Sequence, residues 1–235
     1  MSENTIVIME VSFNIRYLIT VWTLVYLMFK RQPQVTDNLK PITKGFLWAF
    51  SLLALGDTGH VGFRVWAYAL GDLSAKVSIF GQQFGLVGAG ALSTAITITF
   101  FYVIMLFIWH KRFEKPYGWF GWLLFIAAGA RLVIMLLPGN QWNNVFPPKG
   151  MSLYRNLPLM IQGIGVAYLI LRDAFNQKDK LFAWIGVCII VSYALYIPVI
   201  MWVQQVPMIG MLMIPKTIMY LVIAWLAYTR LFIKR

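Results

Sequence analysis

The chain is poor in the residues with which soluble proteins build disulfide frameworks and metal sites. Its 235 residues include one cysteine, two histidines and eight acidic residues. The single cysteine, Cys188, can form neither a disulfide framework nor a cysteine metal site. Charged residues make up 12% of the chain, about half the share of a soluble globular domain. These shortages exclude a soluble fold, a disulfide scaffold and a disordered chain.

Apolar residues, by contrast, are abundant. They make up 60% of the chain, and the mean hydropathy is +0.72. This share is about what seven membrane-spanning helices of about 20 residues each require. We therefore predict an all-α integral membrane protein, a seven-helix bundle forming one polytopic domain over residues 1–235, multi-pass in the cell membrane with the lipid bilayer as its surroundings. The predicted spans are 9–29, 46–70, 84–109, 117–137, 153–171, 181–203 and 209–231.

Basic residues gather in the loops at one end of the predicted bundle. The first, third and fifth loops and the C-terminus hold Lys30, Arg31, Lys40, Lys44, Lys111, Arg112, Lys115, Arg172, Lys178, Lys180, Arg230, Lys234 and Arg235. The opposite loops hold only Lys76 and Lys149. Cytoplasmic loops carry such an excess, so the N-terminus is predicted outside and the C-terminus in the cytoplasm. The same distribution explains the net charge of +12 as a signal of membrane orientation. We therefore expect no nucleic-acid partner.

A weak internal repeat relates the two ends of the chain. KGFLWAF at the start of the second span aligns with KLFAWIG in the sixth, which sets Asp57 opposite Tyr193 and His60 opposite Tyr196. The first three and last three spans run in the same direction, with the fourth between them. This 3+1+3 layout resembles that of sugar-efflux and vitamin-uptake transporters, in topology alone and without their motifs.

Some basic residues fall inside the predicted spans, all in their outer halves. They are Arg16, Arg64, Arg131, Arg155 and Lys216. A charge within the membrane costs about 2.5–3.5 kcal/mol on insertion scales, so this layer requires a reason. One reason is snorkelling, in which the long side chain lifts its charge to the headgroups, and it is the better explanation for Arg155. The other, which we favour for the group, is an outward-facing cavity lined with positive charge.

The second span carries the strongest local signal, ALGDTGHVGFR. Asp57, His60 and Arg64 follow one another at i, i+3 and i+7, which predicts one polar stripe on a helix face. An acidic residue near the bilayer midplane is a functional-site hypothesis, with Arg64 or a neighbouring arginine as its expected partner. The alternative is that Asp57 only neutralises an arginine and stabilises the bundle.

We expect neither a metal nor another cofactor. Zinc needs three or four protein ligands, and the predicted spans offer no further His, Glu or Asp deep in the membrane beside Asp57 and His60. Lys216 in the seventh span would suit a retinal Schiff base, yet Leu212 stands where microbial rhodopsins carry an acid. A cation in an anion-binding cavity is the favoured role for Lys216.

The favoured function is transport or binding of an anionic or amphiphilic small molecule or lipid headgroup. Its ligand-binding residues are predicted to be Asp57, His60, Arg64, Arg16, Arg131, Lys216 and Arg155. The alternative is a membrane-embedded lipid-modifying enzyme, a hydrolase or transferase, with Asp57 and His60 as catalytic candidates. In that case Ser93, Thr94 or Thr97 would supply a hydroxyl nucleophile. A receptor for the same ligand class is the third possibility, and the oligomeric state is left open.

Overall fold

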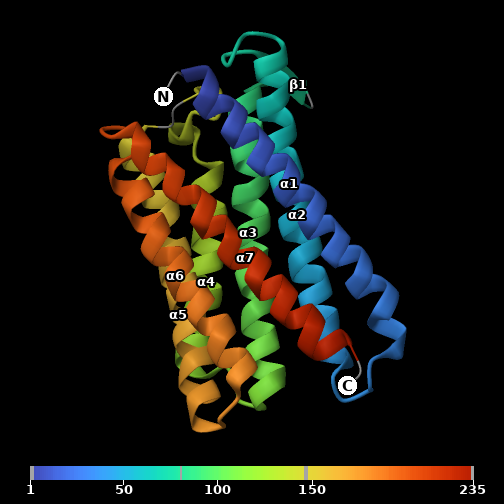
Figure 1. Cartoon of the computed structure of the whole chain (residues 1–235). Helices are drawn as coiled ribbons and strands as arrows, with labels where there is room; N and C mark the ends of the chain where they lie inside the picture. Colours follow the sequence, from blue (N-terminus) through green and yellow to red (C-terminus); the bar gives the residue numbers. More distant parts are fainter. Residues whose placement is uncertain (1–2, 80, 146–147, 234–235) are drawn as a thin grey trace.

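The chain folds into a bundle of long helices that lie side by side (Figure 1). The computed structural model describes residues 3–79, 81–145 and 148–233. The helices are α1 (Glu3–Arg31), α2 (Lys40–Ala69), α3 (Leu86–Phe113), α4 (Gly118–Leu136), α5 (Lys149–Asn176), α6 (Lys180–Trp202) and α7 (Met213–Ala227). Short elements join them: the 3-10 turns Gln32–Gln34, Pro138–Asn140 and Pro207–Leu212, the strands β1 (Lys76–Ile79) and β2 (Gln82–Gly85), and a π-helical end at Tyr228–Phe232.

Six of these helices are long and apolar enough to cross a membrane. They are α1, α3, α4, α5, α6 and the continuous segment Pro207–Phe232 that contains α7. The exception is α2, because Asp57, His60 and Arg64 lower the hydropathy of its outer half. It nevertheless forms the largest helix–helix interface of the bundle, with α3. An all-α, multi-pass membrane fold follows, while the seventh crossing and the N-out orientation stay predictions.

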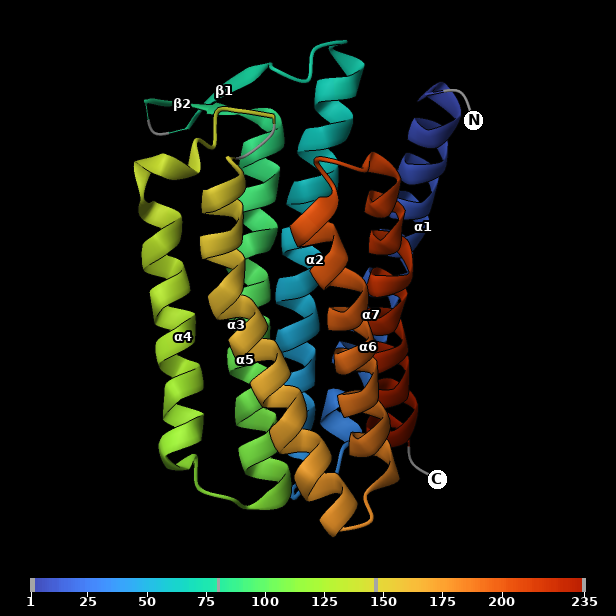
Figure 2. The ribbon, with the colours of Figure 1, turned by 90° about the vertical axis from the view of Figure 1, so that its left-hand side faces the viewer.

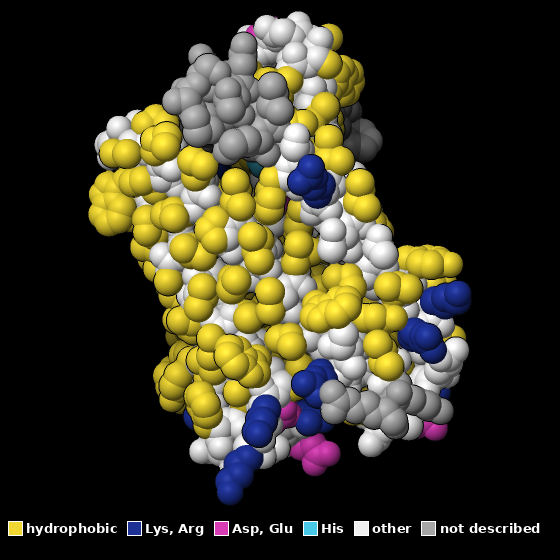
Figure 3. All heavy atoms as spheres, in the orientation of Figure 1, with side chains coloured by type: hydrophobic (Ala, Val, Ile, Leu, Met, Phe, Trp, Pro, Cys, Tyr) yellow, Lys and Arg dark blue, Asp and Glu magenta, His cyan; other side chains and the backbone are white. Residues whose placement is uncertain are grey.

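The surface has the pattern of a protein that faces lipid. Hydrophobic side chains cover most of the face in Figure 3, and basic side chains gather toward its lower end. At the predicted cytoplasmic ends of their helices, four tryptophans are exposed: Trp48, Trp119, Trp184 and Trp225. This is the position that an amphipathic indole prefers at a membrane interface. Trp109, toward the same end of α3, is buried instead, and its Nε1 donates to Asp173 Oδ2 at 2.8 Å.

The opposite, predicted outer end is covered by a hairpin and a loop. Strands β1 and β2 pair antiparallel above the helices, where the sequence predicted only a polar loop (Figure 2). The hairpin follows a turn in which Ser74 donates from Oγ and N to Asp72 Oδ1, which lowers the pKa of the Asp72 carboxyl. Gly85 N, where the hairpin ends, donates to Asn143 Oδ1 at 3.2 Å in the loop after α4. The hairpin and this loop are thus attached to each other over the bundle.

At the predicted cytoplasmic end, α5 is longer than its predicted span of 153–171. It continues to Asn176, so Asp173 is a helical and buried residue where a loop was expected. Its carboxylate accepts from Trp109 and from Arg172. Nearby, Arg112 of α3 forms a salt bridge with Asp179, whose Oδ1 also accepts from Phe182 N and so caps α6. These contacts join α3, α5 and α6 at that end.

Candidate functional site

Asp57 lies where α1, α2 and α3 meet. The two carboxylate oxygens accept hydrogen bonds from neighbouring helices: Tyr17 Oη donates to Oδ2 and Thr94 Oγ1 donates to Oδ1, both at 2.6 Å. The close approach of α3 depends on Gly56, since a side chain there would collide with Thr97. Hydroxyl donors solvate the carboxylate without neutralising it. The Asp57 charge therefore remains available to act on other groups in the bundle.

The other members of the predicted stripe have different surroundings. Arg64 is half-buried, and its Nε donates to Tyr68 Oη at 3.4 Å, one turn further toward the outer end of α2. His60 is half-buried as well, with its backbone packed against Gly90 of α3. Arg16 is exposed on α1, as a snorkelling side chain would be. The structure thus places Asp57 among α1 and α3, and directs Arg64 away from it along α2.

Arg131 of α4 is the most deeply buried charged side chain of the described residues, at 2% exposure. Its Nη1 donates to Thr99 Oγ1 at 2.7 Å and to the Ala95 carbonyl at 3.0 Å, both on α3. Its Nε donates to the Arg155 carbonyl of α5 at 3.0 Å. In the described part of the chain, no carboxylate lies within ion-pair distance of this guanidinium. Carbonyl and hydroxyl oxygens solvate this positive charge, and no described carboxylate neutralises it.

Arg155 of α5 is buried toward the outer end of the bundle. Its guanidinium carbon lies 4.5 Å from the centre of the Trp142 ring, which comes from the loop after α4. The two residues line a cavity of about 30 Å³ together with Asn140 and the first turn of α3. Arg155 Nη1 and Asn140 Oδ1 are both buried and without a hydrogen-bond partner among the described residues. A cavity of this size holds about one water molecule.

Lys216 of α7 is half-buried and lies against aromatic rings. Its Nζ is 4.6 Å from the centre of the Tyr196 ring and 5.6 Å from that of Tyr220, so both rings face the ammonium as cation–π partners. The Tyr196 hydroxyl in turn donates to Asn156 Oδ1 of α5, the residue after Arg155, so Tyr196 connects Lys216 with the region of Arg155.

Arg131, Arg155 and Lys216 form what we call the cationic centre. Tyrosines from three helices surround it, with Tyr102 Oη 2.7 Å from Tyr220 Oη, Tyr193 Oη donating to the Leu159 carbonyl and Tyr196 Oη donating to Asn156. Three formal positive charges share this region with one carboxylate, that of Asp57. Burying unneutralised charge is costly, so the arrangement is suited to receive an anion.

Several residues of the centre were not predicted. Tyr17 is a partner of Asp57, Thr99 of Arg131 and Tyr220 of Lys216, yet each looks in the sequence like an ordinary core residue of a membrane helix. Nothing in one sequence indicates which tyrosines of different helices meet. An outward-facing cavity lined with positive charge was expected; at Arg155 the structure has a hollow of about 30 Å³ beside Trp142.

The catalytic candidates form a simpler arrangement than a triad. Thr94 donates directly to Asp57, so a hydroxyl and a carboxylate are in contact. Over the described residues, no group of three or more His, Cys, Asp or Glu side chains gathers that could hold a metal ion. No protein-family model, curated protein or solved structure matches this chain.

Proposed function

We propose that this chain binds and transports an anionic or amphiphilic small molecule, with the cationic centre as its binding site. The observation that carries the proposal is the burial of Arg131, with no carboxylate of the described residues in ion-pair distance. Arg155 and Lys216 add two more cations whose partners are aromatic rings. A bound anion would offset the cost of holding these charges inside a membrane protein.

The surroundings of the centre suit a ligand with an apolar part. Phe101, Tyr102, Tyr193 and Tyr220 pack edge-on or tilted at ring separations of 5.3–5.6 Å, which makes an aromatic wall beside the charges. Such rings contact apolar groups with their faces and donate hydrogen bonds through their hydroxyls. An anion with an apolar body, such as a carboxylate or phosphate ester, combines both kinds of contact.

The outer end supplies the route by which such a ligand would enter. Trp142 covers the Arg155 guanidinium, and the hairpin is attached to the same loop through Asn143. Displacing the Trp142 ring would expose the guanidinium and enlarge the hollow that already adjoins it. In this proposal the structure is the state closed on the outer side. The loop that carries Trp142 moves to admit the ligand.

The test is identification of the ligand followed by a transport assay. Purified protein is examined by native mass spectrometry for co-purifying anions, and the identified molecule is then offered to vesicles that contain the protein. We expect uptake without chemical change, and a loss of uptake of about tenfold or more in Lys216→Gln. Lys76→Gln is the matched control, because Lys76 is exposed on β1 and belongs to no contact of the centre.

Two results would count against the proposal. Conversion of the molecule, abolished in Asp57→Asn, would favour the membrane-embedded lipid-modifying enzyme, in which Asp57 and Thr94 supply the reacting carboxylate and hydroxyl. Equal uptake by Lys216→Gln, Lys76→Gln and the unaltered protein would remove the cationic centre from the binding site.

A further inference from the structure

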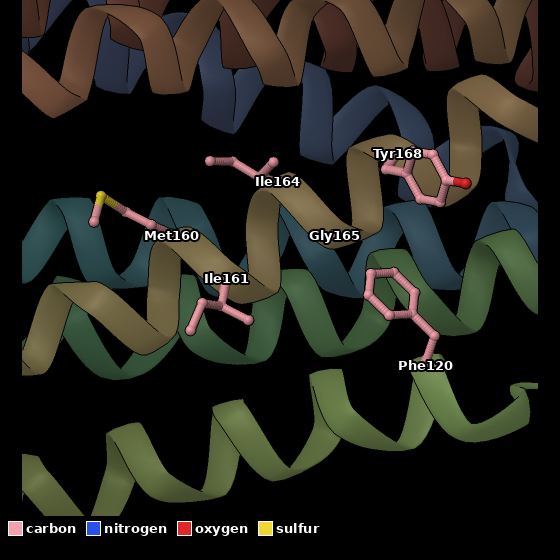
Figure 4. A pocket seen from close by; sticks show the side chains of 6 residues that line it. All are labelled: Phe120, Met160, Ile161, Ile164, Gly165 and Tyr168. Carbon is pink, nitrogen blue, oxygen red and sulfur yellow. The ribbon is translucent and has the colours of Figure 1, made fainter.

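A second hollow lies on the lipid-facing surface, between α4 and α5. It measures about 450 Å³ and is lined by Phe120 of α4 and by Met160, Ile161, Ile164, Gly165 and Tyr168 of α5. In Figure 4 the Phe120 ring rises from α4 toward the α5 side chains. Apart from the Tyr168 hydroxyl and backbone, every lining group is hydrocarbon or thioether. We call this hollow the α4–α5 groove.

The groove follows from one small residue. A side chain at Gly165 would collide with Leu124, so α4 and α5 approach closely there and leave a furrow along the outside of the contact. Ile161 and Ile164 are 44% and 38% exposed along it. Both helices are candidate membrane spans, so these side chains face the hydrocarbon of the bilayer. The natural occupant of such a furrow is therefore an apolar chain.

One end of the groove carries a basic group. The Tyr168 ring packs against Phe120 with ring centres 6.0 Å apart, and the Arg172 guanidinium carbon lies 6.0 Å from the centre of the Tyr168 ring. Arg172 Nε and Nη2 donate to Asp173 at 3.0 and 2.7 Å, which uses two of the five N–H donors of the guanidinium. The Arg172 side chain is 42% exposed. The apolar furrow thus ends at an accessible guanidinium.

The depth of this end matches a headgroup layer. Trp119, one residue before Phe120 on α4, is 79% exposed, and interfacial tryptophans lie at the level of the headgroups. Lys115 and Lys178 are exposed in the adjoining loops. This is the end that the basic loops predict to be cytoplasmic, and anionic lipids are concentrated in that leaflet.

We propose that the α4–α5 groove binds an anionic phospholipid, with one acyl chain along the groove and the phosphate at Arg172. A phospholipid meets both features at once, because its chain matches the hydrocarbon lining and its phosphate matches the guanidinium. The site is separate from the cationic centre. Arg172 and Arg155 are 17 positions apart on α5, which at about 1.5 Å per residue is about 25 Å.

The test is lipid binding to the delipidated, purified chain by native mass spectrometry, with phosphatidylglycerol and phosphatidylcholine as probes. We expect phosphatidylglycerol, which has a net negative charge, to bind more tightly, and Arg172→Gln to weaken it about fivefold; phosphatidylcholine, whose phosphate is offset by its own ammonium, should weaken less. Arg172→Lys should retain most of the preference, because it keeps the charge beside Asp173. Ile164→Trp, which fills the furrow, should weaken both lipids.

Arg31→Gln is the matched control. Arg31 ends α1 at the same side of the membrane, is exposed, and bonds Gln34. An equal effect of Arg31→Gln and Arg172→Gln would show that total charge decides, and would overturn the site. So would equal binding of the two lipids, or a second copy of the chain that protects the groove from added lipid. Thermal unfolding of each variant separates loss of lipid from loss of fold.

Discussion

Arg131→Met removes the most deeply buried charge of the cationic centre. In a soluble core or a salt bridge, removing one buried charge leaves its partner unpaired and is strongly destabilising. Arg131 has no carboxylate partner among the described residues, so its removal leaves no opposite charge behind. Methionine keeps the apolar stem of the arginine side chain and has no polar atom that needs solvation. We therefore expect the fold to tolerate this substitution while the ligand site fails.

The expected change in the free energy of unfolding follows from the three hydrogen bonds of Arg131. Hydrogen bonds inside membrane proteins contribute about 0.6 kcal/mol each, and at most about 1.7 kcal/mol, so three contribute about 2–5 kcal/mol. Holding an arginine in the membrane costs about 2.5–3.5 kcal/mol. The two contributions nearly cancel. The free energy of unfolding should change by about 2 kcal/mol or less.

Stability and bound anion are both measured on the same preparation of the variant. Unfolding of the purified variant in mixed micelles gives its stability, and native mass spectrometry gives the amount of co-purified anion. We expect a near-unaltered unfolding midpoint and at least about a tenfold loss of bound anion, since one of the three cations of the site is gone. Thr99→Val is the companion variant, because it removes one hydrogen-bond partner of Arg131 and leaves the charge in place.

The opposite pattern would contradict a ligand-binding role for Arg131. A loss of about 4 kcal/mol or more in unfolding free energy, with bound anion retained, would make Arg131 a structural connection between α3, α4 and α5. Its buried charge would then stabilise the helix bundle and would not be a ligand-binding group. The same conclusion would follow if Thr99→Val removed as much stability as Arg131→Met.

Three further predictions concern other parts of the chain. Asp57→Asn keeps the shape of the carboxylate but removes its charge, so we expect normal membrane insertion and loss of ligand, measured by expression and native mass spectrometry. Asp179→Ala should lower the thermal unfolding midpoint more than Arg112→Ala, because it removes both the salt bridge and the cap of α6, and equal losses would contradict a role for the cap. Single cysteines at Lys40 and Lys149, without the native cysteine, should react with an impermeant reagent only at Lys149, and labelling at Lys40 would reverse the predicted orientation.

Composition and charge distribution were sufficient to predict the class of fold. Long apolar runs predict membrane helices because hydrocarbon offers no partner to an exposed backbone, and six helices of the required length and hydropathy are present. Boundaries were less predictable. Helix α5 runs beyond its apolar span at both ends, because helical hydrogen bonds continue where hydropathy falls, and the β1–β2 hairpin depends on pairing that a short polar loop does not reveal.

Residue type and depth in the predicted spans were sufficient to select the charged candidates. Helical periodicity was sufficient to relate Asp57, His60 and Arg64 along α2. Which charges meet was decided by the packing of separate helices. Arg131 bonds the Arg155 carbonyl because α4 and α5 lie beside each other, and the Lys216 ammonium is placed by its contacts with the rings of Tyr196 of α6 and Tyr220 of α7. Helical periodicity describes one helix at a time and carries no information on the rotation of one helix against another. The side chains that face a shared interior are therefore known only once the tertiary structure sets those rotations.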